Sequence, residues 1–283
     1  MATGLIMEGG AMRGMYTAGI IDVLMENGIV FDGSIGVSAG ACFGINYKSN
    51  QIGRSIRYNK KYCNDKRYCS VRSLIKTGDM FGADFCYREI PYELDKFDFE
   101  TFQNSPMTFY AVATDIETGK AVYKKIDKCS EKDLQWIRAS ASMPLVSKVV
   151  EIDGRKFLDG GIADSIPLRA FEKLGYNKNV VILTRPRNYQ KKKNSVMPFI
   201  KVAFKDYPEL VKAMDNRHKM YNKQTKYVYD RESEGDVFVF APDEPLPIGR
   251  IEHDPNALEL VYNIGREQAN ARLLELKRFL ESD

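Results

Sequence analysis

A serine between two glycines is the first feature of the sequence that could do chemistry. Gly36, Ser38 and Gly40 form the pattern G-x-S-x-G. The apolar run Ser34–Val37 precedes Ser38 and a run of small and apolar residues, 39–47, follows it, which predicts a strand that turns sharply into a helix. Such a turn exposes a serine Oγ at the edge of a sheet, close to the positive end of the new helix. We therefore expect Ser38 to be a nucleophile, with Gly36 and Gly40 forming the nucleophile elbow.

A second glycine-rich turn lies near the start of the chain. The apolar run Leu5–Met7 is typical of a buried strand, and a helix is expected from about Met15. Backbone N–H groups in the turn between them could hold a phosphate or stabilise an oxyanion. The turn lacks the Lys-Ser/Thr ending of a P-loop, and Ala11 interrupts the pattern G-x-G-x-x-G. We therefore expect an oxyanion hole formed by Gly9, Gly10, Ala11, Met12, Arg13 and Gly14.

A nucleophilic serine needs a base, and the sequence contains only two histidines. His218 lies in a basic segment and His253 precedes a predicted helix start, so neither comes directly after a predicted strand. Asp159 does, because it follows the predicted strand 155–158. Two glycines come after Asp159, so this carboxylate can approach another backbone turn without a steric obstacle.

Together these segments resemble the bacterial patatin-like phospholipase family. The resemblance rests on Gly-Gly-Ala-Met-Arg-Gly, Gly-Val-Ser-Ala-Gly and Asp159-Gly160-Gly161 in this order, and it extends through Ala139–Pro144 and Asp164–Pro167. It implies a Ser38–Asp159 dyad without histidine, the oxyanion turn described above, and neither a metal nor another cofactor. Ala11 stands where the family more often has a third glycine, and an alanine fits there without strain only if its φ is negative.

The resemblance also implies the substrate class, namely acyl esters of phospholipids, lysophospholipids or neutral glycerides. An aspartate is a weak base, with a reference pKa near 4, so the dyad requires burial to raise the pKa of Asp159. Two alternatives stay open on the sequence alone. One is a Ser-His-Asp esterase that uses His253 or His218, and the other is a weakly catalytic lipid-binding protein in which Ala11 impairs the oxyanion turn.

The elements that must position these residues alternate between strands and helices. The N-terminal order of strand, helix, strand, helix favours a parallel sheet with right-handed crossovers. Two predicted hairpins, over residues 108–123 and 149–158, make the sheet mixed. Further strands are predicted at Val180–Leu183 and Val237–Phe240, and helices are predicted to begin at Ser130 and at Asp254.

The expected fold is therefore a three-layer α/β/α arrangement with a mixed, mostly parallel sheet, as the resemblance also implies. We expect a catalytic domain over residues 1–185. Residues 186–283 are expected to form a mainly helical C-terminal region packed on this core, as a lid or a membrane-facing segment.

Charge is unevenly distributed along the 283 residues. The formal net charge is +4, yet residues 185–231 hold 13 basic and four acidic side chains, whereas residues 232–283 hold five and 12. Aromatic residues are interspersed in the basic segment, so we expect it to contact an anionic membrane surface. It contains no recognisable nucleic-acid-binding motif, and we expect no nucleic-acid partner.

The apolar runs, the N-terminal residues and the cysteines indicate where in the cell the protein is expected. The apolar runs are far shorter than the roughly 18 residues that a membrane-spanning helix requires, and the N-terminus does not resemble a secretory signal. The five cysteines include no pair at C-x-x-C spacing, which argues against a disulfide framework or a zinc site. We therefore expect a cytoplasmic protein that contacts the inner face of the membrane.

Overall fold

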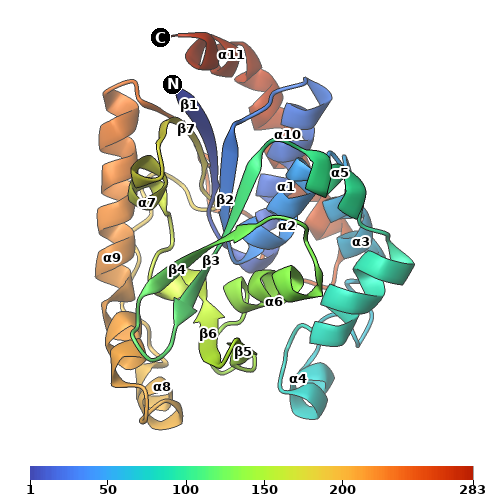
Figure 1. The fold of residues 1–283 in the computed structure, drawn as a ribbon, viewed down its shortest axis with the longest axis vertical. Coiled ribbons are helices and arrows are strands. Elements are labelled where there is room, and N and C mark those ends of the chain that lie inside the picture. Colours follow the sequence, from blue (N-terminus) through green and yellow to red (C-terminus); the bar gives the residue numbers. More distant parts are fainter. Residues whose placement is uncertain (283) are drawn as a thin grey trace.

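A single mixed sheet runs through the centre of the computed structural model, which describes residues 1–282 (Figure 1). Its parallel part has the strand order β3 (Thr108–Asp115), β2 (Gly33–Val37), β1 (Ala2–Met7), β7 (Tyr176–Ile182) and β8 (Val237–Phe240). The antiparallel strands β4 (Ala121–Ile126), β5 (Val150–Ile152) and β6 (Arg155–Asp159) are added at β3. The predicted mixed, mostly parallel sheet is confirmed.

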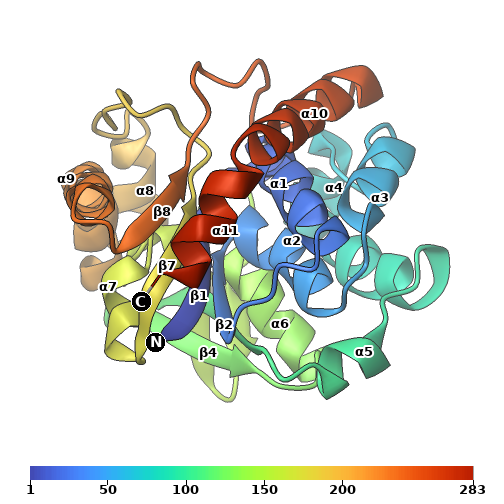
Figure 2. The same cartoon turned by 90° about the horizontal axis from the view of Figure 1, so that it is seen from above.

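Helices cover both faces of the sheet, so its central strands are apolar on both sides. In β1, Leu5 and Met7 join the core under α1 (Gly14–Glu26), α2 (Ala39–Lys48) and α10 (Pro255–Ala271), whereas Ile6 joins the core under α7 (Leu168–Lys173) and α9 (Pro208–Ser233). Figure 2 shows these two helical layers on opposite sides of the strands. The predicted three-layer α/β/α fold is therefore confirmed.

Where a helix cap or a tight turn depends on particular side chains, the sequence predicts the local structure correctly. Ser130 and Asp133 form both hydrogen bonds of a capping box at the start of α6 (Glu131–Ser140). Asp153 and Gly154 have φ values of 52° and 74°, as a tight turn between β5 and β6 requires. The predicted C-terminal helix is present but is divided at Arg272 into α10 and α11 (Leu273–Glu281).

Several short elements have no clear sequence signal. One is the π-helical segment η2 (Phe85–Leu94), in which Pro91 lacks the N–H that a regular α-helix would use. The others are α3 (Arg54–Tyr62), α4 (Val71–Thr77), α5 (Phe99–Asn104), α8 (Met197–Ala203) and the 3₁₀ turns η1 (Ala11–Arg13) and η3 (Gly160–Ile162). Within residues 1–282, no helix is both long enough and apolar enough to cross a bilayer.

The C-terminal helices are tied to the N-terminal core by a close helix crossing. Where α1 meets α10, a methyl group on Gly19 would overlap the carbonyl oxygen of Tyr262, and one on Gly265 would overlap that of Tyr16. The two backbones can approach this closely only because both positions lack a side chain. This contact holds α10 against the helix that follows the Gly9–Gly14 turn.

We predict that Gly265→Ala lowers the free energy of unfolding by about 1–3 kcal/mol, because its methyl group has no space at the crossing. Urea denaturation followed by circular dichroism measures this change. Asn263→Ala, at an exposed position of the same helix, is the control and should change stability by less than about 0.5 kcal/mol. Equal stability of the two variants would contradict this packing.

Candidate active site

Ser38 occupies the sharp turn between β2 and α2. Its backbone has φ 54° and ψ −121°, a strained conformation for a residue with a side chain. The carbonyl oxygen of Ser38 accepts hydrogen bonds from Ala41 and Cys42, and its N–H donates to Ser140 Oγ at 2.9 Å. These contacts hold the serine at the C-terminal end of β2, half-buried and facing a cavity.

The turn after β1 packs directly on the Ser38 turn. A Cβ atom on Gly9 would lie 2.8 Å from Ser38 Cβ, and one on Gly40 would overlap the carbonyl oxygen of Met7. Both glycines are therefore required by close approach of the two turns. The structure thus brings the predicted oxyanion turn beside the predicted nucleophile.

Asp159 meets Ser38 because two strands end at the same point of β3. β2 runs parallel to β3 and its last pair is Val37 with Val112. β6 runs antiparallel to β3 and its last residue, Asp159, pairs with the next residue, Ala113. Since β4 occupies the other edge of β3, β2 and β6 share one edge end to end. Their C-terminal ends therefore meet, which brings Ser38 close to Asp159 although these two residues lie 121 positions apart in sequence.

The segment before β5 and β6 also links the two residues. Ser140 Oγ accepts the Ser38 N–H, and the carbonyl oxygen of Ser142 accepts the Asp159 N–H at 2.7 Å. Both serines lie at the end of α6 or directly after it. One short segment therefore fixes the backbone of both predicted catalytic positions.

The Asp159 carboxyl group is buried, and burial raises its pKa above the usual aspartate value. Four interactions oppose this effect: the positive charges of Arg217 and Arg250, the nearby Ser38 hydroxyl, and the N–H of Gly161, which donates to Asp159 Oδ1 at 2.7 Å. The Gly161 bond also fixes the orientation of the carboxylate. The raised pKa makes Asp159 a better proton acceptor than an exposed aspartate.

The predicted oxyanion turn presents unused backbone donors. Within residues 1–282, the N–H groups of the four residues Gly9–Met12 donate to no protein acceptor, whereas the Arg13 N–H bonds the carbonyl oxygen of Gly10 at 3.2 Å. Ala11 has φ 49°, so the condition for an unstrained alanine is not met. The turn keeps its donors free, but alanine is a strained residue at this position.

A cavity of about 750 Å³ opens above Ser38 and Asp159. One part of its lining is apolar and comes mainly from η2, α6 and the following loop; it includes Met80, Phe81, Ile90, Leu134, Ile137, Met143, Leu145 and Val146. Another part is basic and comes from the C-terminal region; it includes Lys191, Lys192, Lys193, Arg217 and Arg250. The cavity therefore joins a space suited to a hydrocarbon chain to a positively charged region.

The two histidines lie in different surroundings. His253 Nδ1 lies 2.6 Å from the carbonyl oxygen of Cys63, and His253 does not line the cavity. His218 lines the cavity, but within residues 1–282 no protein atom hydrogen-bonds its buried Nδ1. Neither histidine is hydrogen-bonded to Ser38 or Asp159 in the part of the chain described.

Arg217 and Lys191 also line the cavity, but neither belongs to a recognisable sequence motif. Arg217, on α9, donates from Nε to the carbonyl oxygen of Gly161 at 2.5 Å. Lys191 lies in the loop before α8. The excess of basic residues between 185 and 231 was their only sequence signal, and it did not indicate that these two side chains reach the cavity.

Comparison with protein families gives two matches. A family model described as patatin-like phospholipase matches residues 5–172, more than half of the chain. A second model, a domain of unknown function (DUF6363), matches residues 207–281. The first match contains Ser38, Asp159 and the Gly9–Gly14 turn, and the second contains Arg217.

Similar proteins occur in bacteria and fungi. The uncharacterised protein YjjU of Escherichia coli K12 is 27% identical over 197 residues, which cover 64% of this chain and 52% of that protein. The lysophospholipase nte1 of Emericella nidulans is 28% identical over 183 residues, or 62% of this chain and 11% of that protein. An uncharacterised NTE family protein of Mycobacterium bovis is 27% identical over 164 residues, which cover 58% of this chain and 44% of that protein. The chain thus spans about half, or less, of these relatives.

Among solved structures, VipD from Legionella pneumophila aligns with a TM-score of 0.44 and 12% sequence identity. The alignment covers 95% of this chain and 67% of that chain.

We predict that Ala11→Gly raises the free energy of unfolding by about 1 kcal/mol, because glycine adopts a positive φ without the Cβ penalty. Ala41→Gly, within α2, is the matched control and should lower stability by about 1 kcal/mol. Urea denaturation of both variants measures the difference. Similar destabilisation by both substitutions would show that Ala11 is not strained.

Proposed function

Because this chain belongs to the patatin-like phospholipase family, we propose that it hydrolyses acyl esters of lipids with Ser38 as the nucleophile and Asp159 as the general base. The observation that carries the proposal is the end-to-end meeting of β2 and β6 on β3, which places these residues together in one cavity. The lysophospholipases among the relatives support the same class of substrate.

In the proposed mechanism, Ser38 Oγ attacks the ester carbonyl carbon and its proton moves to Asp159. The carbonyl oxygen becomes an oxyanion, which accepts hydrogen bonds from the free N–H groups of the Gly9–Met12 turn. Asp159 then protonates the leaving alcohol, and an acyl group remains on Ser38. Asp159 next removes a proton from water, whose oxygen attacks the acyl carbon. Asp159 then returns this proton to Ser38 Oγ as the bond between Oγ and the acyl carbon breaks, which releases the fatty acid and restores both residues.

The surroundings of Asp159 support a role for it as a base without histidine. The carboxyl must be ionised to accept the Ser38 proton, so kcat/KM should fall as the pH drops through its pKa. Because burial raises that pKa, the fall belongs above pH 4, the usual range of an exposed aspartate. The apolar part of the cavity would receive the acyl chain.

We predict that Ser38→Ala and Asp159→Asn each lower kcat/KM for a lysophospholipid by at least about 10³-fold, because each removes a member of the dyad. Release of fatty acid from a long-chain lysophospholipid is the assay, and reaction with a fluorophosphonate reports on the nucleophile. Asp153→Asn, at the exposed turn between β5 and β6, is the control carboxylate and should retain activity.

The same assays separate the competing mechanisms. Full activity in Asp159→Asn would rule out the dyad. Loss of activity in a folded His218→Ala/His253→Ala double variant would instead support a histidine base. Failure of the wild-type protein to react with the fluorophosphonate or to hydrolyse any ester would favour the weakly catalytic lipid-binding protein, for which the positive φ of Ala11 is the supporting observation.

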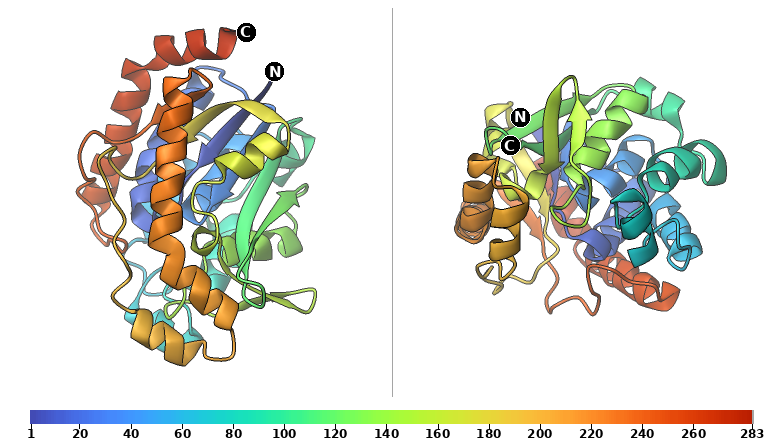
Figure 3. Two further views of the ribbon diagram at one scale, coloured as in Figure 1. Left: turned by 90° about the vertical axis from the view of Figure 1, so that its left-hand side faces the viewer. Right: turned by 90° about the horizontal axis from the view of Figure 1, so that it is seen from below.

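We also propose that one end of the molecule contacts an anionic membrane. On α8, Phe199 and Val202 are 70% and 75% exposed, and the exposed residues Lys192, Lys201 and Lys205 lie on or near this helix. Figures 1 and 3 show α8 and α4 at the same end of the molecule. Exposed apolar side chains beside lysines suit insertion between anionic headgroups.

This surface is narrower than the predicted segment 185–231. Tyr189 and Tyr221 pack against each other, and Tyr227 donates to Glu172 at 2.6 Å, so much of the aromatic content of the segment faces the protein. In this proposal the protein acts in the cytoplasm, where the anionic inner face of the membrane would meet its α8 end.

We predict that the Phe199→Ser/Val202→Ser double variant binds vesicles containing phosphatidylglycerol at least about tenfold more weakly, because it loses the apolar side chains that enter the bilayer. Vesicle cosedimentation measures the partition. Leu274→Ser is the matched control, since Leu274 is 71% exposed on α11 at the opposite end of the molecule. Equal weakening by the control would refute a contact specific to the α8 end.

A further inference from the structure

Four cationic side chains gather on the basic side of the active-site cavity: Arg13, Arg185, Lys191 and Arg217. We call them the cationic cluster. Arg217 and Lys191 line the cavity, and Lys191 is close enough to the three arginines for their charges to lower its pKa. Arg13, from the predicted oxyanion turn, interacts in the same way with Arg185. The cluster thus joins the catalytic segment to the C-terminal region.

The four positive charges of the cluster exceed the negative charge beside them, which comes from Glu8 and Asp159. Within residues 1–282, none of the four cations forms an ion pair with a carboxylate, and the buried Nε of Arg13 has no acceptor. Neighbouring residues in the same segment differ, because Arg187 pairs with Glu232 at 2.5 Å and Lys193 pairs with Asp215 at 3.0 Å.

The nearest carboxylates are already engaged. Glu8 accepts the N–H of Thr184 at 2.6 Å and the hydroxyl of Tyr221 at 2.8 Å. Asp159 is the proposed base and is held by Gly161. Burial of like charges without a counter-charge is costly, and its effect is visible in the pKa of Lys191, lowered to about 7, first by burial and then by Arg217.

The cluster is also held in place. The side-chain amide of Asn222 binds both backbone groups of Lys191, accepting its N–H at 2.8 Å and donating to its carbonyl oxygen at 3.1 Å. The Lys191 ammonium lies 4.3 Å from the centre of the Tyr221 ring, and Arg185 lies 4.5 Å from that of Tyr189. These contacts hold the Lys191 backbone and orient the Lys191 and Arg185 side chains.

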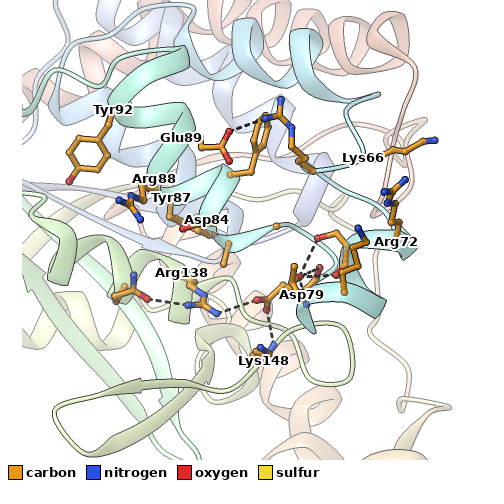
Figure 4. Close-up of a pocket in the computed structure, with 18 of the residues that line it drawn as sticks. Lys66, Arg72, Asp79, Asp84, Tyr87, Arg88, Glu89, Tyr92, Arg138 and Lys148 are labelled. Carbon is orange, nitrogen blue, oxygen red and sulfur yellow. Dashed lines mark hydrogen bonds and ion pairs between the residues drawn. The ribbon is translucent and has the colours of Figure 1, made fainter.

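A second cavity of about 780 Å³, between α4, η2 and α6, provides a contrast (Figure 4). It is also rich in basic side chains, but within residues 1–282 those that form no ion pair there are exposed. Arg138 binds Asp79 at 3.2 Å, and Arg67 binds Glu89 at 3.0 Å. Within residues 1–282, partly buried cations without an ion pair are therefore a feature of the Ser38 cavity and not of the second cavity.

We infer that the cationic cluster is a subsite for a phosphate group next to the scissile ester, so that the protein prefers acyl esters whose headgroup carries a net negative charge. This inference rests on the proposed ester hydrolysis at Ser38. Lys191 and Arg217 would face the phosphate oxygens, and Arg13 and Arg185 would add positive charge behind them.

A choline headgroup fits this subsite poorly. A quaternary ammonium ion is commonly recognised by aromatic faces. Here Lys191 and Arg185 already lie over Tyr221 and Tyr189. The positive charge of choline would also be repelled by the cationic cluster. A phosphodiester with an uncharged alcohol would instead give the headgroup a net negative charge, which the cluster attracts.

The test compares oleoyl lysophosphatidylglycerol with oleoyl lysophosphatidylcholine, which share the acyl chain and the phosphodiester. We expect the wild-type protein to prefer lysophosphatidylglycerol over lysophosphatidylcholine by at least about tenfold in kcat/KM. Lys191→Gln should reduce this preference by about tenfold. Lys76→Gln, in the second cavity, is the matched control and should keep the preference. A wild-type preference near unity, or an unchanged preference in folded Lys191→Gln, would overturn the inference.

The pH dependence provides an independent readout. The groups facing Lys191 are Arg217, Arg185, Arg13 and Glu8, of which the arginines lower its pKa and Glu8 raises it. Lys191 carries its charge below its pKa of about 7, so the preference should fall between pH 6 and pH 8.5 in the wild-type protein. Lys191→Arg should keep the preference and remove this fall, because arginine stays charged. The same fall in Lys191→Arg would contradict the role of Lys191.

Binding of inorganic phosphate, measured by calorimetry, separates failure of the subsite from failure of the proposed function. If no ester is hydrolysed but phosphate binds the wild-type protein at least about fivefold more tightly than Lys191→Gln, the hydrolase proposal fails and the anion subsite stands. If esters are hydrolysed without preference and phosphate binding is unaffected by the substitution, the subsite fails and the hydrolase proposal stands.

Discussion

The register of β3 is the constraint on which the candidate site depends. Its residues 108–112 pair with β2 and its residues 113–115 pair with β6 along the same edge, so the two strands must stop where they meet. Ser38 and Asp159 are the residues at which they stop. A shift of one residue in either pairing would turn alternate side chains to the other face of the sheet and separate the pair. The glycines around both turns matter because they allow backbones to meet at this junction.

Sequence patterns predicted the parts of the fold in which local signals and the sheet agree. Apolar runs before glycine turns located β1 and β2, and the Ser130 capping box located α6. By contrast, the segment from α3 to α5 is shaped by tertiary packing around aromatic residues such as Tyr68 and Phe85, and Pro91 within η2 disrupts any regular period. The candidate site residues could be predicted because their motifs are local, whereas Arg217 reaches Gly161 from α9 through a contact between residues far apart in sequence.

The C-terminal region contributes to both the sheet and the cavity. β8 extends the parallel sheet beside β7, and α10 crosses α1 at Gly19 and Gly265. The loop after β7 and helix α9 bring Lys191 and Arg217 to the cavity that contains Ser38. The uneven charge of the sequence therefore has two structural components: exposed lysines around α8, and a few partly buried cations directed at the cavity.

The partly buried cations also affect the proposed base, Asp159. Burial raises the pKa of Asp159, but the charge of Arg217 acts against this change, so the carboxylate is a weaker base than burial alone would make it. An anion bound beside Arg217 would offset part of that positive charge and let the pKa of Asp159 rise further. A phosphate at this position would therefore both orient the ester and strengthen the base proposed to activate Ser38. A neutral ester would gain neither effect, which links the charge of the headgroup to the rate of the chemical step.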